Sequence, residues 1–223
     1  MRRFAAPESP TSSRRRRPPD ELVAQDRRLR QVAVALGREY GFDEPHAIQV
    51  TCLALSLFDQ LYQALRIDEN DRHLLHAAAL LHDIGMGVSE ARHHKISLAL
   101  IARSDLPGLS AAELLLAANV ARYHRRSAPA LRHPAYAALN AGDRQRVVRL
   151  SALLRLADVL DRDHRQAVRR VRAGLRKSRL LLTVEGSDVE LPDEAVRLRK
   201  SRLFERIFAR RVEWHIAGWP RVA

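Results

Sequence analysis

The chain has 223 residues, of which 46% are hydrophobic and 29% are charged, as expected for a globular protein with one large domain or one domain and a small appendage. No uncharged apolar run approaches the roughly 18 residues of a membrane-spanning helix, so we expect no membrane segment and no membrane partner. The single cysteine, Cys52, excludes a disulfide framework and a cysteine-rich zinc site, and it favours a reduced, cytoplasmic location.

The net charge of +13 comes mainly from the two ends of the chain. Residues 1–20 carry six arginines against two acidic residues, and residues 162–223 carry 16 basic against eight acidic residues, whereas the centre is nearly neutral. Residues 1–20 have no apolar period and are expected to form a disordered basic tail. Part of the basicity is a preference for arginine, since three of the 39 basic residues are lysines. The charge still favours an anionic partner, which includes nucleic acid bound through the basic ends.

Residues 21–164 are predicted to form a helical domain, because apolar residues recur there at steps of three and four. Gly41 is a good C-terminal stop for the first helix, and Pro45 can open the second. The apolar stripe expected along this second helix comprises Ile48, Cys52, Leu55, Phe58 and Leu61.

Three further helices are predicted in this domain. Asp71 is expected to cap a helix that ends near Gly85, and Asp143 one that continues through Asp158. Ser110 and Glu113 form the pattern of a capping box for a helix that runs to Tyr123. Five or more helices joined by short loops predict an orthogonal or bundled all-α core.

Residues 165–223 are predicted to form a small α+β appendage packed on this core. Residues 180–184 are typical of a strand, residues 185–188 of a turn, and residues 189–191 are expected to pair back as a hairpin. A helical pattern returns over residues 194–211, and residues 212–216 are predicted to form a last strand. The predicted fold class is therefore mainly α, with a small C-terminal α+β appendage.

Histidines and aspartates recur where the predicted helices begin or end. The candidates are His46, His82, Asp83, His93, His94, His124 and Asp158. Imidazole and carboxylate together bind Mn, Fe, Co, Ni, Zn or Mg, whereas the lack of thiolates argues against a structural zinc site. Taken singly, His46 and Asp158 are also consistent with structural roles, and it is the joint occurrence that indicates a divalent metal site. We interpret His73 and His76, which lie outside the pattern, as ordinary partly exposed side chains.

The adjacency of His82 and Asp83 restricts where such a site can form. Neighbouring residues on a helix do not share a face, so the two side chains can meet one ion only near a helix end, which Gly85 provides. A charged aspartate that directly follows the apolar run of residues 77–81 also needs a partner or an ion.

These motifs resemble those of the HD superfamily of metal-dependent phosphohydrolases. The resemblance rests on His46, Ala-Ala-Leu-Leu-His82-Asp83-Ile-Gly, His93-His94-Lys95, Ala-Arg-Tyr-His124-Arg125 and Leu-Arg-Leu-Ala-Asp158-Val-Leu-Asp161-Arg. More narrowly, residues 21–215 are similar to the C-terminal HD domain of the exopolyphosphatase and guanosine pentaphosphate phosphohydrolase (Ppx/GppA) family. The resemblance implies an HD-domain-like helical core over residues 21–164.

The resemblance also implies roles for individual residues. His46, His82, Asp83 and Asp158 would hold one divalent ion, and His124 with His93 or His94 would hold a second ion or a phosphate. The expected catalytic residues are Asp83, Lys95 and Arg125. Lys95, Arg125 and Arg126 would neutralise charge on the transferred phosphoryl group, unless they are ordinary solvated side chains of the surface. Asp161 would either orient a metal ligand or pair with Arg165 on the helix surface.

Two departures limit what the resemblance implies. The chain lacks the ATPase-type domains that carry the phosphatase activity in full-length members, so exopolyphosphatase activity does not follow from the resemblance alone. The family stretch His-His-Lys-His-Ser is here His93-His94-Lys95-Ile96-Ser97, with one histidine fewer. The first metal position is therefore supported more fully than the second.

The leading hypothesis from the sequence is a metal-dependent phosphohydrolase that acts on a phosphorylated nucleotide or a polyphosphate-like small molecule. One alternative is a non-catalytic module that binds polyphosphate, a guanosine polyphosphate or nucleic acid. Another is a regulatory partner of a separate phosphatase, and homodimer formation is left open.

Overall fold

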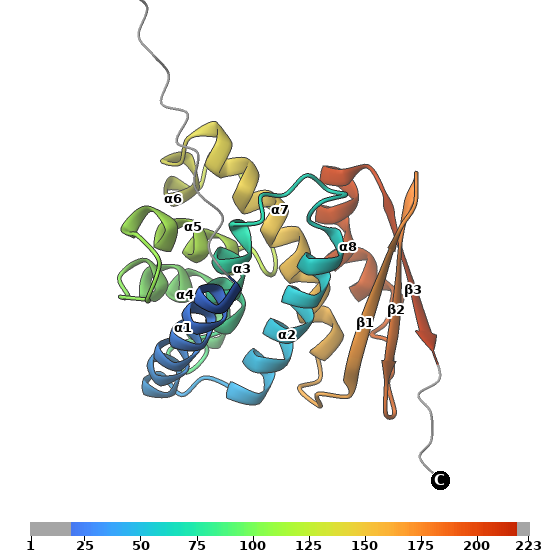
Figure 1. Ribbon diagram of the computed structural model, residues 1–223, viewed down its shortest axis with the longest axis horizontal. Helices are drawn as coiled ribbons and strands as arrows, with labels where there is room; N and C mark the ends of the chain where they lie inside the picture. The colour runs from blue at the N-terminus through green and yellow to red at the C-terminus, as the bar shows by residue number, and fades with distance from the viewer. Residues whose placement is uncertain (1–18, 218–223) are drawn as a thin grey trace, which may run out of the picture.

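The computed structural model describes residues 19–217, so the predicted basic tail lies outside the described residues apart from its last two. A layer of helices stands beside a small sheet (Figure 1). The helices are α1 (Pro19–Glu39), α2 (Glu44–Leu61), α3 (Asp71–Leu80), α4 (His93–Ala102), α5 (Ala111–Arg122), α6 (Pro134–Ala137), α7 (Ala141–Asp158) and α8 (Glu194–Phe208), with short 3-10 turns at Glu90–Arg92 and Val159–Asp161. The prediction of a mainly α protein with a small C-terminal α+β part is confirmed. No helix among the described residues is both long and apolar enough to span a bilayer.

Helix α3 lies at the centre of the helical layer and contacts α1, α2, α5 and α7. Its residues Ala77, Ala78 and Ala79 are completely buried. Alanine side chains let neighbouring helices approach closely, so this triplet allows one short helix to contact four others. The turn that follows α3 is therefore held in the interior of the protein, and it carries His82 and Asp83.

The sheet has the order β1-β2-β3, with β1 (Val168–Leu175), β2 (Arg179–Gly186) and β3 (Arg211–Ala217). Strands β1 and β2 are antiparallel, whereas β2 and β3 are parallel and are joined through α8. Strand β1 packs against α2, and α8 packs against α7. The C-terminal part is thus joined to the two long helices that carry His46 and Asp158.

Several local predictions are confirmed. Helix α1 ends two residues before Gly41, whose φ of 65° suits the left-handed turn that a glycine allows, and the Phe42 N–H donates back to the Gly37 carbonyl at 3.1 Å. Ser110 and Glu113 form the predicted capping box of α5. The helix and the last strand expected over residues 194–216 are α8 and β3.

Other local predictions are wrong, each for an identifiable reason. Residues 189–191 form no strand, because β2 pairs instead with β1, an arginine-rich strand that lacks a regular apolar alternation. Asp71 does not cap α3: its carboxylate is buried against Arg146. Asn140, not Asp143, caps α7 by accepting the Asp143 N–H at 2.9 Å. Cys52 is exposed, because the buried face of α2 runs through Val50, Leu53, Ala54 and Leu57.

Candidate metal centre

The structure brings six of the seven predicted metal-ligand candidates together from five different segments. His46 lies in the first turn of α2, His82 and Asp83 follow the end of α3, and His93 begins α4. His124 lies just beyond α5, and Asp158 is the last residue of α7. Helix ends converge here, so residues far apart in the sequence can point their side chains into one small volume. The four histidines in this set are at most 2% exposed.

A first group of donors contains His46, His82 and Asp83, whose ligand atoms all lie within 4.8 Å of one another. The carboxylate of Asp158 joins them, since its Oδ1 lies 3.8 Å from Nε2 of His46 and 3.7 Å from Nε2 of His82. Two imidazoles and two carboxylates of this kind suit a borderline divalent ion. These are the four residues expected to hold the first ion.

A second group contains Asp83, His93 and His124, and it shares Asp83 with the first group. Asp83 Oδ1 lies 3.2 Å from Nε2 of both His93 and His124, while its Oδ2 lies 3.5 Å from Nε2 of His82. The Nε2 atoms of His93 and His124 are 3.4 Å apart. The carboxylate of Asp83 therefore has one oxygen toward each group, as a bridging ligand between two ions would.

The tautomer of each histidine is fixed by its other ring nitrogen. Nδ1 lies 2.7 Å from a backbone carbonyl in His82 (Ala79), His93 (Glu90) and His124 (Ala121). A carbonyl only accepts hydrogen bonds, so Nδ1 carries the hydrogen and Nε2 presents a lone pair to the site. His46 follows the same rule, because its Nδ1 donates to Asp161 Oδ2 at 2.8 Å. Such outer partners are the usual way in which proteins orient metal-binding histidines.

The donors fit a bound cation better than they fit one another. Lone pairs on Asp83 Oδ1 and on the Nε2 atoms of His93 and His124 face each other at 3.2 to 3.4 Å. Neither Asp83 Oδ1 nor His82 Nε2, both buried, has a hydrogen-bond partner among the described residues. Buried polar atoms without partners are costly, and a divalent ion would satisfy them.

The electrostatics keep these groups in metal-binding protonation states. Burial lowers the pKa of His82, and burial together with the charges of His82 and Lys200 lowers the pKa of His124 to about 3. Burial alone would raise the pKa of Asp83, but the nearby His82, His124 and His93 bring it well below its usual range. The imidazoles of His82 and His124 are therefore neutral and the carboxylate of Asp83 is ionised near pH 7, as metal ligands must be. Burial alone would lower the pKa of His46, but Asp161, Asp158 and Asp83 raise it above its usual value in the metal-free protein.

Gly85 lets the turn after α3 approach the start of α4. A Cβ on Gly85 would lie 2.5 Å from the backbone oxygen of His93, and the Gly85 N–H donates to Ser97 Oγ at 3.1 Å. Any other residue here would push the Asp83 turn away from His93. The glycine therefore sets the spacing of the second donor group.

The sequence did not point to Lys200 or to the role of Arg155. The ammonium of Lys200 pairs with Asp158 Oδ2 and donates to the His124 carbonyl at 3.1 Å, which leaves Asp158 Oδ1 facing the histidines. Arg155 is buried and donates to the carbonyls of Tyr123, Arg125, Arg126 and Ser127, so it fixes the loop that carries His124. The only available signal for Lys200 was its rarity, as one of three lysines among 39 basic residues.

The structure distinguishes the two readings of Asp161. Its side chain is 1% exposed and accepts from His46 Nδ1 and from the Gln166 N–H, and the latter distance is 2.7 Å. It therefore orients His46 and does not lie on the helix surface. The ring of His164 stacks on His46 at 3.8 Å between centroids, and its Nδ1 lies 2.7 Å from Asp43.

The remaining predicted residues belong to neither donor group. His94 lies beside His93 but belongs to neither donor group; burial and the charges of His93 and nearby arginines lower its pKa to about 4. Arg125 NH1 lies 3.3 Å from His93 Nε2, whereas Arg126 is exposed on the same loop. Lys95 is exposed on α4.

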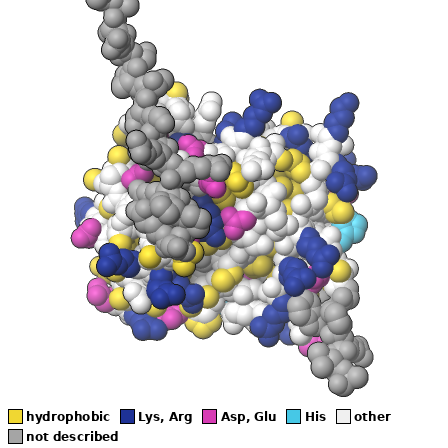
Figure 2. Space-filling view, viewed as in Figure 1, with side chains coloured by type: hydrophobic (Ala, Val, Ile, Leu, Met, Phe, Trp, Pro, Cys, Tyr) yellow, Lys and Arg dark blue, Asp and Glu magenta, His cyan; other side chains and the backbone are white. Residues whose placement is uncertain are grey.

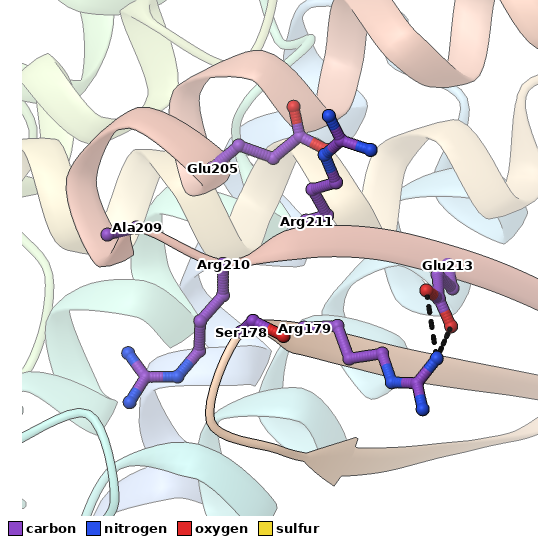
Figure 3. A pocket seen from close by; sticks show the side chains of 7 residues that line it. All are labelled: Ser178, Arg179, Glu205, Ala209, Arg210, Arg211 and Glu213. Atoms are coloured by element: carbon purple, nitrogen blue, oxygen red, sulfur yellow. Dashed lines mark hydrogen bonds and ion pairs between the residues drawn. The ribbon is translucent and has the colours of Figure 1, made fainter.

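A surface hollow of about 620 Å³ lies in the C-terminal part, and none of the metal-ligand candidates lines it. Figure 3 shows that Arg179, Arg210 and Arg211 line it together with Glu205 and Glu213, and Arg179 is paired with Glu213. Lys and Arg side chains are also spread widely over the face shown in Figure 2, where a histidine is visible at one edge. The hollow therefore offers basic groups for an anion, but the convergent donors lie elsewhere.

Comparison with known proteins gives consistent matches. A family model described as Ppx/GppA phosphatase, domain III, matches residues 28–204. A guanosine-5'-triphosphate,3'-diphosphate pyrophosphatase of Photobacterium profundum is 32% identical over 168 residues, which cover 71% of this chain and 33% of the relative. The protein of the same name from Vibrio vulnificus is 33% identical over 141 residues, covering 63% and 27%. The chain thus spans about a third or less of the length of these relatives.

Proposed function

This chain belongs to the Ppx/GppA phosphatase domain III family, and we propose that it is a metal-dependent phosphohydrolase that acts on a phosphorylated nucleotide or a polyphosphate-like substrate. The observation that carries the proposal is the convergence of four histidine Nε2 atoms on Asp83 and Asp158, with buried donor atoms that lack hydrogen-bond partners. The names of the relatives support a guanosine nucleotide with several phosphates as the substrate.

In this proposal the HD-type helical domain, residues 21–164, supplies the metal ligands. His46, His82, Asp83 and Asp158 hold one ion, and Asp83, His93 and His124 hold a second. A divalent ion at such a site lowers the pKa of a bound water and polarises a phosphoryl oxygen. The appendage, residues 165–223, contributes Lys200, whose ammonium holds one oxygen of Asp158 and thereby leaves the other for the ion.

Basic side chains around the donors bind the phosphoryl group. Arg125 is placed for this role because its guanidinium lies 3.3 Å from His93 Nε2, at the edge of the second donor group. Arg126 and Lys95 provide further positive charge from the solvent side. A planar guanidinium can bind two phosphate oxygens at once, and Arg155 holds the loop of Arg125 in position through its backbone carbonyls.

The experiment compares the protein stripped with a chelator and the protein reloaded with Mn, Fe, Co, Ni, Zn or Mg. Release of phosphate is measured from guanosine-5'-triphosphate,3'-diphosphate and from inorganic polyphosphate. We expect hydrolysis only after reloading, and its loss in Asp83→Asn but not in Asp163→Asn, an exposed aspartate of the same segment as Asp161. A reloaded protein that binds its ions but hydrolyses neither compound would refute the proposal.

A second candidate is a non-catalytic module that binds a polyanion such as polyphosphate or nucleic acid. The observation that favours it is the hollow lined by Arg179, Arg210 and Arg211. In that case Arg210→Ala should bind polyphosphate more weakly than the wild type does. The affinity of the wild type should fall steeply as the salt concentration rises, and the metal-loaded protein should hydrolyse no substrate. Tight binding that survives Arg210→Ala would exclude this hollow as the binding site.

A further inference from the structure

A second cluster of donors lies apart from the candidate metal centre, between α1 and α3. It consists of Asp26 on α1 and of His73 and His76 on α3, and one ligand atom from each lies within 4.8 Å of the others. We propose that these three residues form a separate binding site for a divalent transition-metal ion of the zinc class, which links α1 to α3. Only the fold brings Asp26 to the two histidines, and His76 is buried rather than partly exposed as expected.

The distances suit a tetrahedral ion. Asp26 Oδ1 lies 3.1 Å from His76 Nδ1 and 3.5 Å from His73 Nδ1. Zinc ligands at about 2.0–2.1 Å in a tetrahedron are separated from one another by about 3.3 Å. Both oxygen–nitrogen distances thus lie within a few tenths of an ångström of the tetrahedral separation.

Neighbouring groups already orient two of the three ligands. His73 Nε2 lies 3.3 Å from the Pro107 carbonyl, which can only accept, so a hydrogen on Nε2 leaves the Nδ1 lone pair toward Asp26. Gln25 Nε2 lies 3.3 Å from the same ring nitrogen and also donates to the Gly108 carbonyl at 3.5 Å. Arg72 NH1 holds Asp26 Oδ2 at 2.7 Å and thereby leaves Oδ1 for the ion.

The cluster is open enough for an ion to enter. The Asp26 side chain is 31% exposed, whereas that of His76 is 6% exposed. Three protein ligands and an open side leave the fourth position of a tetrahedral ion to water. Imidazole nitrogen with one carboxylate selects Zn, Co or Ni over Mg or Ca, which prefer oxygen ligands.

Bound metal would stabilise the folded protein, because the unfolded chain does not hold the three ligands together. The number of zinc or cobalt ions per chain is measured by elemental analysis, and the rise in Tm is measured when zinc is added. His73→Gln should bind one ion fewer than the wild type and lose part of the zinc-dependent rise in Tm. His215→Gln, which removes an exposed histidine of β3, should match the wild type in both measurements.

Two histidine variants are compared, because a substitution at the buried His76 can prevent folding. His73 is more exposed, so its substitution disturbs the fold less. His76→Gln should give the same loss of one ion if it folds, and Asp83→Asn should leave this site occupied. Cobalt at this site should also show the visible bands of a tetrahedral ion, which His73→Gln should remove. Unchanged metal content and unchanged zinc-dependent Tm in His73→Gln would overturn the proposal and leave the cluster as an ion pair of Asp26 with Arg72.

Discussion

Replacing Asp161 by asparagine tests whether a buried carboxylate orients a metal ligand of the centre. Asp161 accepts from His46 Nδ1 at 2.8 Å, from Gln166 Nε2 at 3.3 Å and from the Gln166 N–H at 2.7 Å, with both oxygens in use. An asparagine keeps one acceptor and turns the other atom into a donor. Whichever way the amide faces, one buried N–H then meets another donor.

The magnitude follows from these contacts. If the amide nitrogen faces the Gln166 N–H, the lost bond and the unpaired donor cost about 1–3 kcal/mol of the free energy of unfolding. If it faces His46, the imidazole loses the partner that fixes its tautomer, and outer partners of this kind are worth about 10- to 100-fold in metal affinity. In either orientation a buried donor is left without an acceptor, and the neutral amide supports His46 less well than the carboxylate does. We therefore expect Asp161→Asn to show a loss of that order in affinity, together with a lower stability of the metal-free protein.

Metal affinity is measured by competition with a chromophoric chelator, and stability by urea unfolding of the metal-free protein. Asp163→Asn is the matched control, because it makes the same change at an exposed position two residues away. If Asp161→Asn and Asp163→Asn bound metal equally well, the contact between Asp161 and His46 would have no part in metal binding, and the reasoning would be refuted.

Four further predictions follow from the same geometry. Because Asp83 is shared by both donor groups, Asp83→Asn should lower metal content by two ions per chain, whereas Asp158→Asn should affect only the first group; elemental analysis distinguishes them. Lys95→Ala should cost on the order of 10²-fold in the rate of phosphate release with unchanged metal content, and an unchanged rate would remove Lys95 from the proposed site. In the metal-free protein, burial holds the pKa of His124 at about 3; as the pH falls below about 6.5, the unfolded chain takes up a proton that the folded chain does not. His124 should therefore contribute a fall of about 1.4 kcal/mol per pH unit to the free energy of unfolding, and urea unfolding at pH 7 and pH 5 should show a slope reduced by about that amount in His124→Asn. Gly85→Ala places a Cβ against the His93 carbonyl and should cost about 1–3 kcal/mol and weaken metal binding, unlike Gly174→Ala, where the nearest atom would lie 3.7 Å away.

The prediction of the C-terminal strands shows where sequence reasoning fails. The strand of residues 180–184 was found because it is a dense run of β-forming residues, but its partners were not determined by that run. Strand β1 carries arginines at exposed positions and has an irregular register between Val168 and Arg170. Strand pairing is decided by long-range packing against α2 and α8, which no local pattern contains.

For the candidate site, the sequence determined the residue types, because the joint occurrence of histidines and aspartates at several helix ends indicates a metal site. It predicted seven candidates, and the structure brings six of them together, whereas His94 belongs to neither donor group. The six are His46, His82, Asp83, His93, His124 and Asp158. The sharing of Asp83 between two groups depends on the direction of its two oxygens, which follows from how the turn after α3 meets α4 and α5.

By itself the sequence determined the helical core and the set of metal-ligand candidates. The core follows from apolar residues at steps of three and four, and the candidates follow from histidines and aspartates at the predicted helix ends. Only the tertiary structure decided which groups hold the metal-ligand candidates in place. Asp161 accepts a hydrogen bond from His46, Lys200 pairs with Asp158, and Arg155 donates to the loop that carries His124. Lys200 lies 42 residues from Asp158 along the chain, and Asp161 lies 115 residues from His46. Such contacts depend on the packing of whole helices, so spacing along the chain cannot reveal them.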